Sequence, residues 1–551
     1  MPVLDTCQQS FFSPTFLDPD CLIPGSVAWV LWQLGDSLLP GWFTREWRGH
    51  ATTTRSAGRA AWPARTLFAL HLLRWDAGGG SRLGACRRAR TDLAWRAAMG
   101  LPVGGSTPTE STMREFESWL RSRANSCDVP RSLLVHEHLA RRALRGREDD
   151  VLCAMDSTPM WCFGALKGTL RLLGDGLRGL ARKLARALDR PLGACASDWE
   201  LPWLTSRSMK GGLTGVDWRS RNSRREVVDR VARGVLRAVE AVRASIHEMP
   251  EPKRPAVLSR CEHLLKVIAD DLEEDEEGRL VIARRVAADR LVSITDPEAR
   301  SGRKTQSVAF KGYRLHILAD LTSGVVLATD GVAANTHDSA VGDSLIRRAK
   351  RILPTLRQVL ADTAYGATAV RVGLAAEGID LVAPPQMPGR KSTESVRKHQ
   401  FQVDFDTGIA TCPKGEASTE CRTVTLHGES RLLFLWDRGP CARCPLRPAC
   451  APRTRPADAP VPTRGRPARY GKRLTLHPHE RALREAREQW TRPERKRLYR
   501  RRAEVVLVIA RAVRQGARQS RAYGLSAANL QAHSIAMTLN AAIIGRSLVQ
   551  E

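Results

Sequence analysis

The pattern of apolar and polar positions divides the 551-residue chain into helical and mixed segments. Residues 1–150 show helical spacing, with ARTLFALHLLRW (64–75) apolar enough for a core helix and a Gly turn plus basic amphipathic helix at 78–102. A short apolar run, VLCAMDST (151–158), precedes a second helical segment from about 164 to 290. The pattern therefore predicts two helical regions on either side of one strand.

Strand patterns return after residue 305. Apolar and polar residues alternate in FKGYRLHILAD (310–320) and VVLATDGVAAN (325–335) around the turn LTSG, which predicts a hairpin. A helix (339–353), a strand ending at Asp362, a helix (368–378) and a strand (379–384) follow. This order predicts an α/β protein with a mixed sheet and helices on both faces.

Composition narrows the choice of partner. Lys and Arg number 87 against 58 Asp and Glu, a net charge of +29. Such an excess predicts a polyanionic partner, because neutralising phosphates releases counterions and drives binding to nucleic acid. A membrane surface is disfavoured, because no apolar run is long enough to span a bilayer and no secretory signal is evident. We expect a cytoplasmic, nucleoid-associated protein whose 13 cysteines are reduced thiols or metal ligands.

Two acids end apolar runs. Asp156 follows VLCAM and Asp362 follows LRQVLA, and small or turn-forming residues come next. Either acid could simply be a turn residue. If the strands are neighbours, however, two carboxylates meet, and a divalent ion between them would relieve their repulsion. Mg²⁺ or Mn²⁺ held there would suit phosphodiester cleavage.

A set of motifs in fixed order resembles a known family. The motifs are MDSTPM, TDPEARSGRK, FKGYRLHILAD, VAANTHDS and LADTAYG, with a cysteine segment before a basic C-terminal helix and GGGSRLGACRRARTDLAWRAAMGLP near the start. Together they resemble bacterial insertion-sequence transposases of the DDE type, whose catalytic domain is ribonuclease-H-like. The resemblance implies that Asp156, Asp362 and a Glu on the C-terminal helix bind Mg²⁺ or Mn²⁺ and catalyse DNA cleavage and strand transfer. It also implies a helical insertion after the first strand and a homodimer on double-stranded DNA.

The third acid departs from the family pattern, which places Tyr, Arg, Glu and Lys at fixed spacing. If Tyr499 is taken as the Tyr of this pattern, the Glu position falls on Val506. If Glu504 is taken as the Glu, the acid is present but no Tyr stands at the Tyr position. Two residues on a helix differ by about 200° in direction. Either Glu504 completes the site or the chain is a catalytically inactive, transposase-derived DNA-binding protein.

Two further sites are predicted. CARC supplies Cys441 and Cys444, and with Cys412 and Cys450 these thiols suit a tetrahedral structural Zn²⁺ site, with Cys421 as a spare ligand and free thiols as the alternative. Phosphate binding is expected from two basic helical segments. Their candidate DNA-binding residues are Arg87, Arg88, Arg90, Arg497, Arg500, Arg502, Arg511 and Arg514.

The predicted domains follow these segments. They are a helical DNA-binding domain (1–145), a ribonuclease-H-like catalytic domain (146–385 and 476–545, with the helical insertion at about 164–290) and a Cys-rich insertion (386–475). The cysteine insertion is expected to have few strands and no core of its own.

Overall fold

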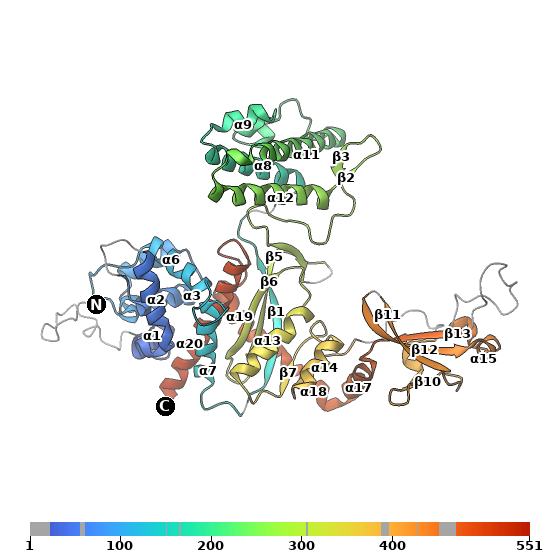
Figure 1. The fold of residues 1–551 in the computed structure, drawn as a ribbon. Helices are drawn as coiled ribbons and strands as arrows, with labels where there is room; N and C mark the ends of the chain where they lie inside the picture. The colour runs from blue at the N-terminus through green and yellow to red at the C-terminus, as the bar shows by residue number, and fades with distance from the viewer. Residues whose placement is uncertain are drawn as a thin grey trace. The chain divides into compact units, whose positions relative to one another are not determined.

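The computed structural model describes residues 22–54, 61–149, 151–164, 167–304, 307–386, 396–426, 428–450 and 470–550. The chain forms two compact units, Met1–Thr355 with Glu504–Glu551, and Leu356–Ala503. Figure 1 shows the elements of both units. Each unit is described by itself, and the predicted α/β class is confirmed.

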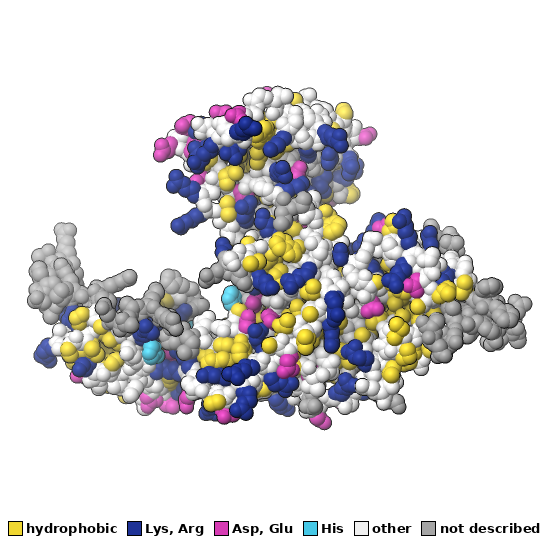
Figure 2. Space-filling model, turned by 180° about the vertical axis from the view of Figure 1, so that it is seen from behind, with side chains coloured by type: hydrophobic (Ala, Val, Ile, Leu, Met, Phe, Trp, Pro, Cys, Tyr) yellow, Lys and Arg dark blue, Asp and Glu magenta, His cyan; other side chains and the backbone are white. Residues whose placement is uncertain are grey.

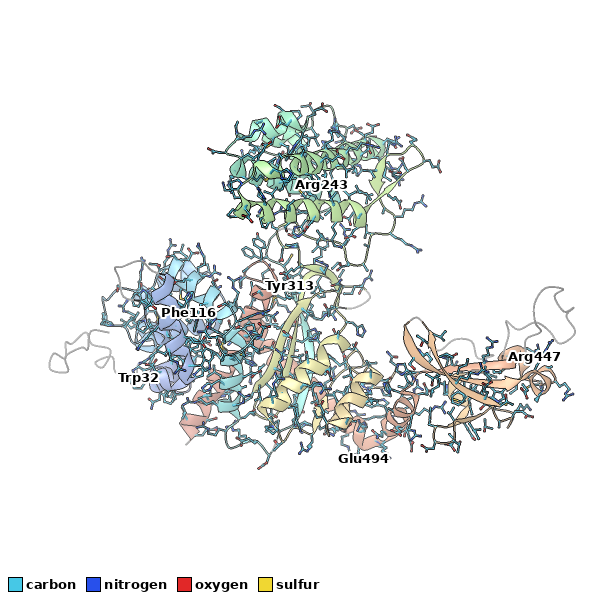
Figure 3. All side chains as sticks on the ribbon, viewed as in Figure 1. Trp32, Phe116, Arg243, Tyr313, Arg447 and Glu494 are labelled. Carbon is cyan, nitrogen blue, oxygen red and sulfur yellow. The ribbon has the colours of Figure 1, made fainter. Side chains whose placement is uncertain are left out.

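The N-terminal part of the first unit is a helical bundle. Its helices are α1 (Val27–Leu34), α2 (Gly41–Thr54), α3 (Ala64–Asp76), α4 (Arg82–Thr91), α5 (Leu93–Met99), α6 (Glu110–Arg121) and α7 (Arg131–Leu144). Phe43, Phe116 and Trp119 pack edge-to-face or stacked in its core, where Phe116 is labelled in Figure 3. The predicted core helix 64–75 is confirmed as α3. The single helix expected at 78–102 is instead two, because the Asp92 side chain accepts the Trp95 N–H and starts α5.

The sheet of the first unit is built around one long strand. Its strands are β1 (Cys153–Trp161), β4 (Arg300–Arg303), β5 (Ala309–Asp320) and β6 (Val326–Ala333). β5 pairs antiparallel with β1, β4 and β6, and β5 and β6 form the predicted hairpin. β1 continues five residues beyond Asp156, so the expectation that Asp156 ends its strand is wrong. The turn-like residues after Asp156 stay extended because β5 pairs with them as far as Trp161.

Helices cover both faces of this sheet. Tyr313 (Figure 3), Leu315 and Ile317 share a core with α19 (Val505–Arg514) and α20 (Leu525–Gln550). On the other face His316 is fully buried, and α13 (Ser339–Ile352) packs against β5 and β6. α20 is apolar nearly all round and also contacts α3 and α7, so it joins the bundle to the sheet.

The helical insertion between β1 and β4 is confirmed as helical. It contains α8 (Thr169–Ala187), α9 (Leu192–Asp198), α10 (Met209–Gly212), α11 (Arg221–Ala244), α12 (Arg254–Asp271) and the hairpin of β2 (Leu272–Glu274) with β3 (Leu280–Ile282). Leu177, Trp199, Val235 and Leu264 belong to a core that lies within the insertion. On the face shown in Figure 2, lysine and arginine side chains are spread over this lobe.

The second unit begins with an α/β segment. β7 (Gln358–Leu360) and β8 (Asp380–Val382) are parallel and connected through α14 (Thr368–Ala376). The remaining elements are β9 (Gln402–Asp404), β10 (Ile409–Thr411), β11 (Glu420–Leu426), β12 (Glu429–Asp437), α15 (Arg438–Ala442), α16 (Arg447–Cys450), β13 (Tyr470–Leu476), α17 (Glu480–Thr491) and α18 (Pro493–Arg500).

Two expectations about this part of the chain are wrong. The cysteine segment is rich in strands and has a small core of its own, formed around Phe401, Phe434 and Trp436. The basic C-terminal helix is interrupted, because Pro493 starts α18 and holds Arg492 extended, and a 3₁₀ helix, η8 (Arg501–Glu504), precedes α19.

None of the described helices is long and apolar enough to cross a membrane.

Candidate active site and nucleic-acid interface

Asp156 lies on the inner face of β1. It stands directly opposite Ile317 on β5, and directly opposed residues of an antiparallel pair point to the same face. Ile317 shares its core with Val508 and Ile509 of α19, so Asp156 is on the face that α19 covers. The Asp156 side chain is half-buried, and its Oδ1 accepts the N–H of Ser157 at 2.7 Å.

Glu504 comes immediately before that covering helix. It is the last residue of η8, it is half-buried, and α19 contacts β1 and β5. The buried residues of α19 are Val505, Val508, Ile509 and Ala512. Val506, the other candidate position for the third acid, is 52% exposed. Glu504 is therefore the candidate of the two that is half-buried at the start of the packed helix.

Asp362 follows β7 by two residues, as the sequence predicts. Its Oδ1 accepts the N–H of Ala364 at 2.9 Å, and Tyr365 in the same turn is fully buried. Asp362 is therefore a turn residue at the end of a strand. This position is compatible with a purely structural turn residue and with a metal-binding catalytic acid.

Arg371 supports the Asp362 turn and was missed in the sequence. Its guanidinium is buried and donates to the carbonyls of Gly366 (3.1 Å), Leu381 (3.0 Å) and Ala383 (2.6 Å). Burial lowers the pKa of Arg371 to about 10, with the positive charge of Arg495 lowering it further. The available signal was one charged residue within the apolar helical run TAVRVGLAA.

Several motif residues have structural partners. Asp296 is fully buried, where its Oδ1 accepts the Tyr313 hydroxyl and the N–H of Gly524 next to the start of α20. Burial raises the pKa of Asp296. Asp338 occupies the N-cap position of α13 without a capping hydrogen bond and pairs with Arg314 instead.

The candidate DNA-binding arginines come from two units. Arg87, Arg88 and Arg90 are exposed on α4, and Arg88 also pairs with Asp92. Arg497 and Arg500 are exposed on α18, whereas Arg502 is half-buried and stacks its guanidinium on Tyr499. Arg511 and Arg514 are exposed on α19. All eight lie on helices or helical turns, and seven of them are exposed.

The four predicted zinc ligands lie in one neighbourhood of the second unit. Burial raises the pKa of Cys441, and the nearby thiols of Cys450, Cys412 and Cys444 raise it further. Cys412 Sγ accepts the N–H of Lys414 at 3.4 Å in a turn closed by Gly415, whose φ is +86°. Among the described residues, however, no three His, Cys, Asp or Glu side chains form a group that could hold a metal ion.

The protein is thus of the α/β class, with Asp156 on a strand, Asp362 just after another strand, and many arginines at its surface. Residues 289–541 match the family model described as Transposase DDE domain. Residues 289–541, somewhat less than half of the chain, therefore resemble a transposase DDE domain. The matched segment includes Asp362 and Glu504 but begins after Asp156 and most of the helical insertion. Comparison of the chain with curated proteins and with solved structures finds no match in either.

Proposed function

We propose that this protein is a transposase that cleaves DNA at the ends of a mobile element and joins the freed 3′-hydroxyl to target DNA. Asp156, Asp362 and Glu504 are the proposed catalytic acids, in a ribonuclease-H-like domain. The observation that carries the proposal is that Asp156 shares a sheet face with α19, the helix that Glu504 precedes. The family match supports the same assignment because it includes Asp362 and Glu504.

The three carboxylates fit a divalent cation by their chemistry, because Mg²⁺ and Mn²⁺ prefer oxygen ligands. Cations bound there would lower the pKa of a bound water and stabilise the leaving oxygen of the phosphodiester. The chain itself supplies fixed acid positions, since a backbone N–H holds one oxygen of Asp156 and another holds one oxygen of Asp362. We also propose a homodimer on double-stranded DNA, because two element ends must be processed together.

The test uses the full chain and the DNA that flanks its gene. We expect strand cleavage that requires Mg²⁺ or Mn²⁺ and is abolished by Asp362→Asn. Asp343→Asn is the matched control, because Asp343 is a partly exposed acid that pairs with Arg347 on the same helix, α13. Salt-sensitive DNA binding without breakage at any metal concentration would contradict the proposal and favour the catalytically inactive DNA-binding protein.

We further propose that Cys412, Cys441, Cys444 and Cys450 bind a structural Zn²⁺. Support comes from the thiol donor set, from the turn that presents Cys412, and from Gly471, where an added Cβ would lie only 2.3 Å from Cys441 Cβ. Because the thiols do not form a metal-holding group among the described residues, metal binding would require them to move closer together.

A further inference from the structure

A cavity of about 360 Å³ lies in the first unit, along α19 and α20. Val508, Leu539 and Ile543 give it an apolar floor, and each of these side chains is almost completely buried. Arg511 and Arg514 line it from α19, and Arg546 lines it from α20. Gly324, in the turn between β5 and β6, completes the wall; a Cβ there would come within 3.2 Å of Arg511.

The three arginines line the same cavity, and all three are exposed. Within the described part of the chain, no hydrogen bond or ion pair engages their side chains. Burial lowers the pKa of Arg546, and the like charges of Arg511 and Arg147 lower it further. Among the described residues that line the cavity, Asp76 is the one acid, so these residues carry three positive charges against one negative charge. Such a cluster favours an anion.

A second observation indicates a ligand with a hydrogen-bond donor. Gln515 lines the same cavity and is 8% exposed, and its Oε1 has no donor among the described residues. A buried carbonyl oxygen without a partner costs about 1–3 kcal/mol, so such atoms call for an explanation. A ligand that supplied an N–H to this oxygen would remove that cost.

We propose that this cavity binds one nucleotide of the DNA strand that is being processed. A nucleotide combines the required features: phosphate oxygens for the three arginines, a base surface for the apolar floor, and an amino or imino N–H for Gln515 Oε1. Arg511 and Arg514 lie seven and ten residues beyond Glu504, or about 10 and 15 Å along a helix. That span corresponds to about three to four nucleotides of one strand in B-DNA. The inference rests on the proposed function because it assigns substrate DNA to this cavity.

The first experiment measures binding of the full chain to a fluorescent 30-base-pair duplex as a function of salt. Removing a phosphate contact should lower the slope of log K against log salt by about 1. We therefore expect the variants Arg511→Gln, Arg514→Gln and Arg546→Gln each to reduce the slope by at most about 1, and the triple variant by about 1 to 2, because one nucleotide is flanked by two phosphates. Arg347→Gln is the matched control, because it removes the same charge from an arginine already paired with Asp343. Slopes for the cavity variants equal to that of the control would overturn the proposal.

The second experiment separates binding from folding. Gln515→Met removes the oxygen that has no donor, so thermal stability should be unchanged or higher. Affinity for the duplex should nevertheless fall several-fold. Unchanged affinity would contradict the role of Gln515. Competition by millimolar dAMP or inorganic phosphate without any effect of the arginine variants on duplex binding would assign the cavity to a free anion and also overturn the proposal.

Both measurements are independent of cleavage. If the arginine and glutamine variants weaken DNA binding while the wild-type chain does not cut, the cavity assignment stands and the catalytic proposal fails. If cutting proceeds and the variants bind as the control does, the catalytic proposal stands and the cavity assignment fails.

Discussion

Asp156 and Ile317 lie directly opposite each other on β1 and β5, and both face the layer formed by α19 and α20. This register places the acid on the covered face of the sheet. It also relates Asp156 to Glu504, because the helix that follows Glu504 packs on the same face.

The register of the third acid gives a direct prediction. Glu504→Gln should reduce strand cleavage more than about 100-fold, because a neutral amide is a poor ligand for a divalent cation. Restoring an acid two residues later, in the double variant Glu504→Gln/Val506→Glu, should not rescue cleavage because residue 506 is 52% exposed. Gel assays on labelled DNA measure both. Restored cleavage in the double variant would show that residue 506, and not residue 504, is the position of the third catalytic acid.

Replacing Arg371 should disturb the turn that carries Asp362. Arg371→Met leaves the carbonyls of Gly366, Leu381 and Ala383 without their donor, at a cost of about 1–3 kcal/mol for each group left unpaired. We expect earlier unfolding of the second unit, measured by limited proteolysis, together with reduced cleavage. Arg357→Met, which removes an arginine near the start of β7, is the control. Equal protease resistance of Arg371→Met and wild type would contradict a supporting role.

The bundle should depend on one buried carboxylate. Glu117 accepts hydrogen bonds from Arg74 and from Arg82 and lies 3.3 Å from His71 Nδ1. Burial opposes its ionisation, but His71 and the arginines outweigh burial and lower the pKa of Glu117 to about 2. Glu117→Gln should cost about 3–5 kcal/mol, since Arg74 remains buried without its counter-charge. A melting temperature within about 2 °C of wild type would contradict this prediction, because a loss of only about 1 kcal/mol lowers the melting temperature of a domain of this size by about 2–4 °C.

Acid should destabilise the first unit through His136. Burial lowers the pKa of His136 to about 4, while its Nε2 lies 3.0 Å from the Val326 carbonyl and Arg348 is nearby. Because the folded pKa is below the unfolded value of about 6.5, the unfolded chain binds the proton more readily as pH falls. Stability is thus fully present above pH about 6.5 and decreases towards pH 4, by about 3 kcal/mol in total. His136→Gln should reduce this pH dependence in melting curves; an identical pH profile would contradict the assignment.

Zinc binding can be tested by metal analysis. The purified chain should contain about one Zn²⁺, and the variants Cys412→Ser and Cys444→Ser should lose it. Cys421→Ser is the matched control, because Cys421 is exposed on β11. Chelation should make the cysteine segment sensitive to protease. Metal-free protein with the same protease resistance as the metal-supplemented chain would contradict a structural zinc site.

The sequence predicted helices and strands correctly where either strand alternation or helical spacing dominated a contiguous segment. The hairpin of β5 and β6, the helices α3 and α13, and the helical insertion follow from alternation or helical spacing in contiguous residues. Asp362 at the end of β7 follows in the same way. Such signals are local because side-chain direction repeats every two residues in strands and every 3.6 in helices.

Non-local contacts decided the rest. The residues after Asp156 form a turn pattern, yet pairing with β5 keeps them extended; the cysteine segment gains its strands from β11, β12 and β13 pairing across distant positions. The sequence by itself determined the α/β class, the basic character and the candidate acids of this chain. Only the tertiary structure decided which face Asp156 occupies, that Glu504 rather than Val506 is half-buried at the start of α19, and which arginines share a cavity. Those properties depend on backbone pairing and burial between segments far apart in the chain, which no local pattern encodes.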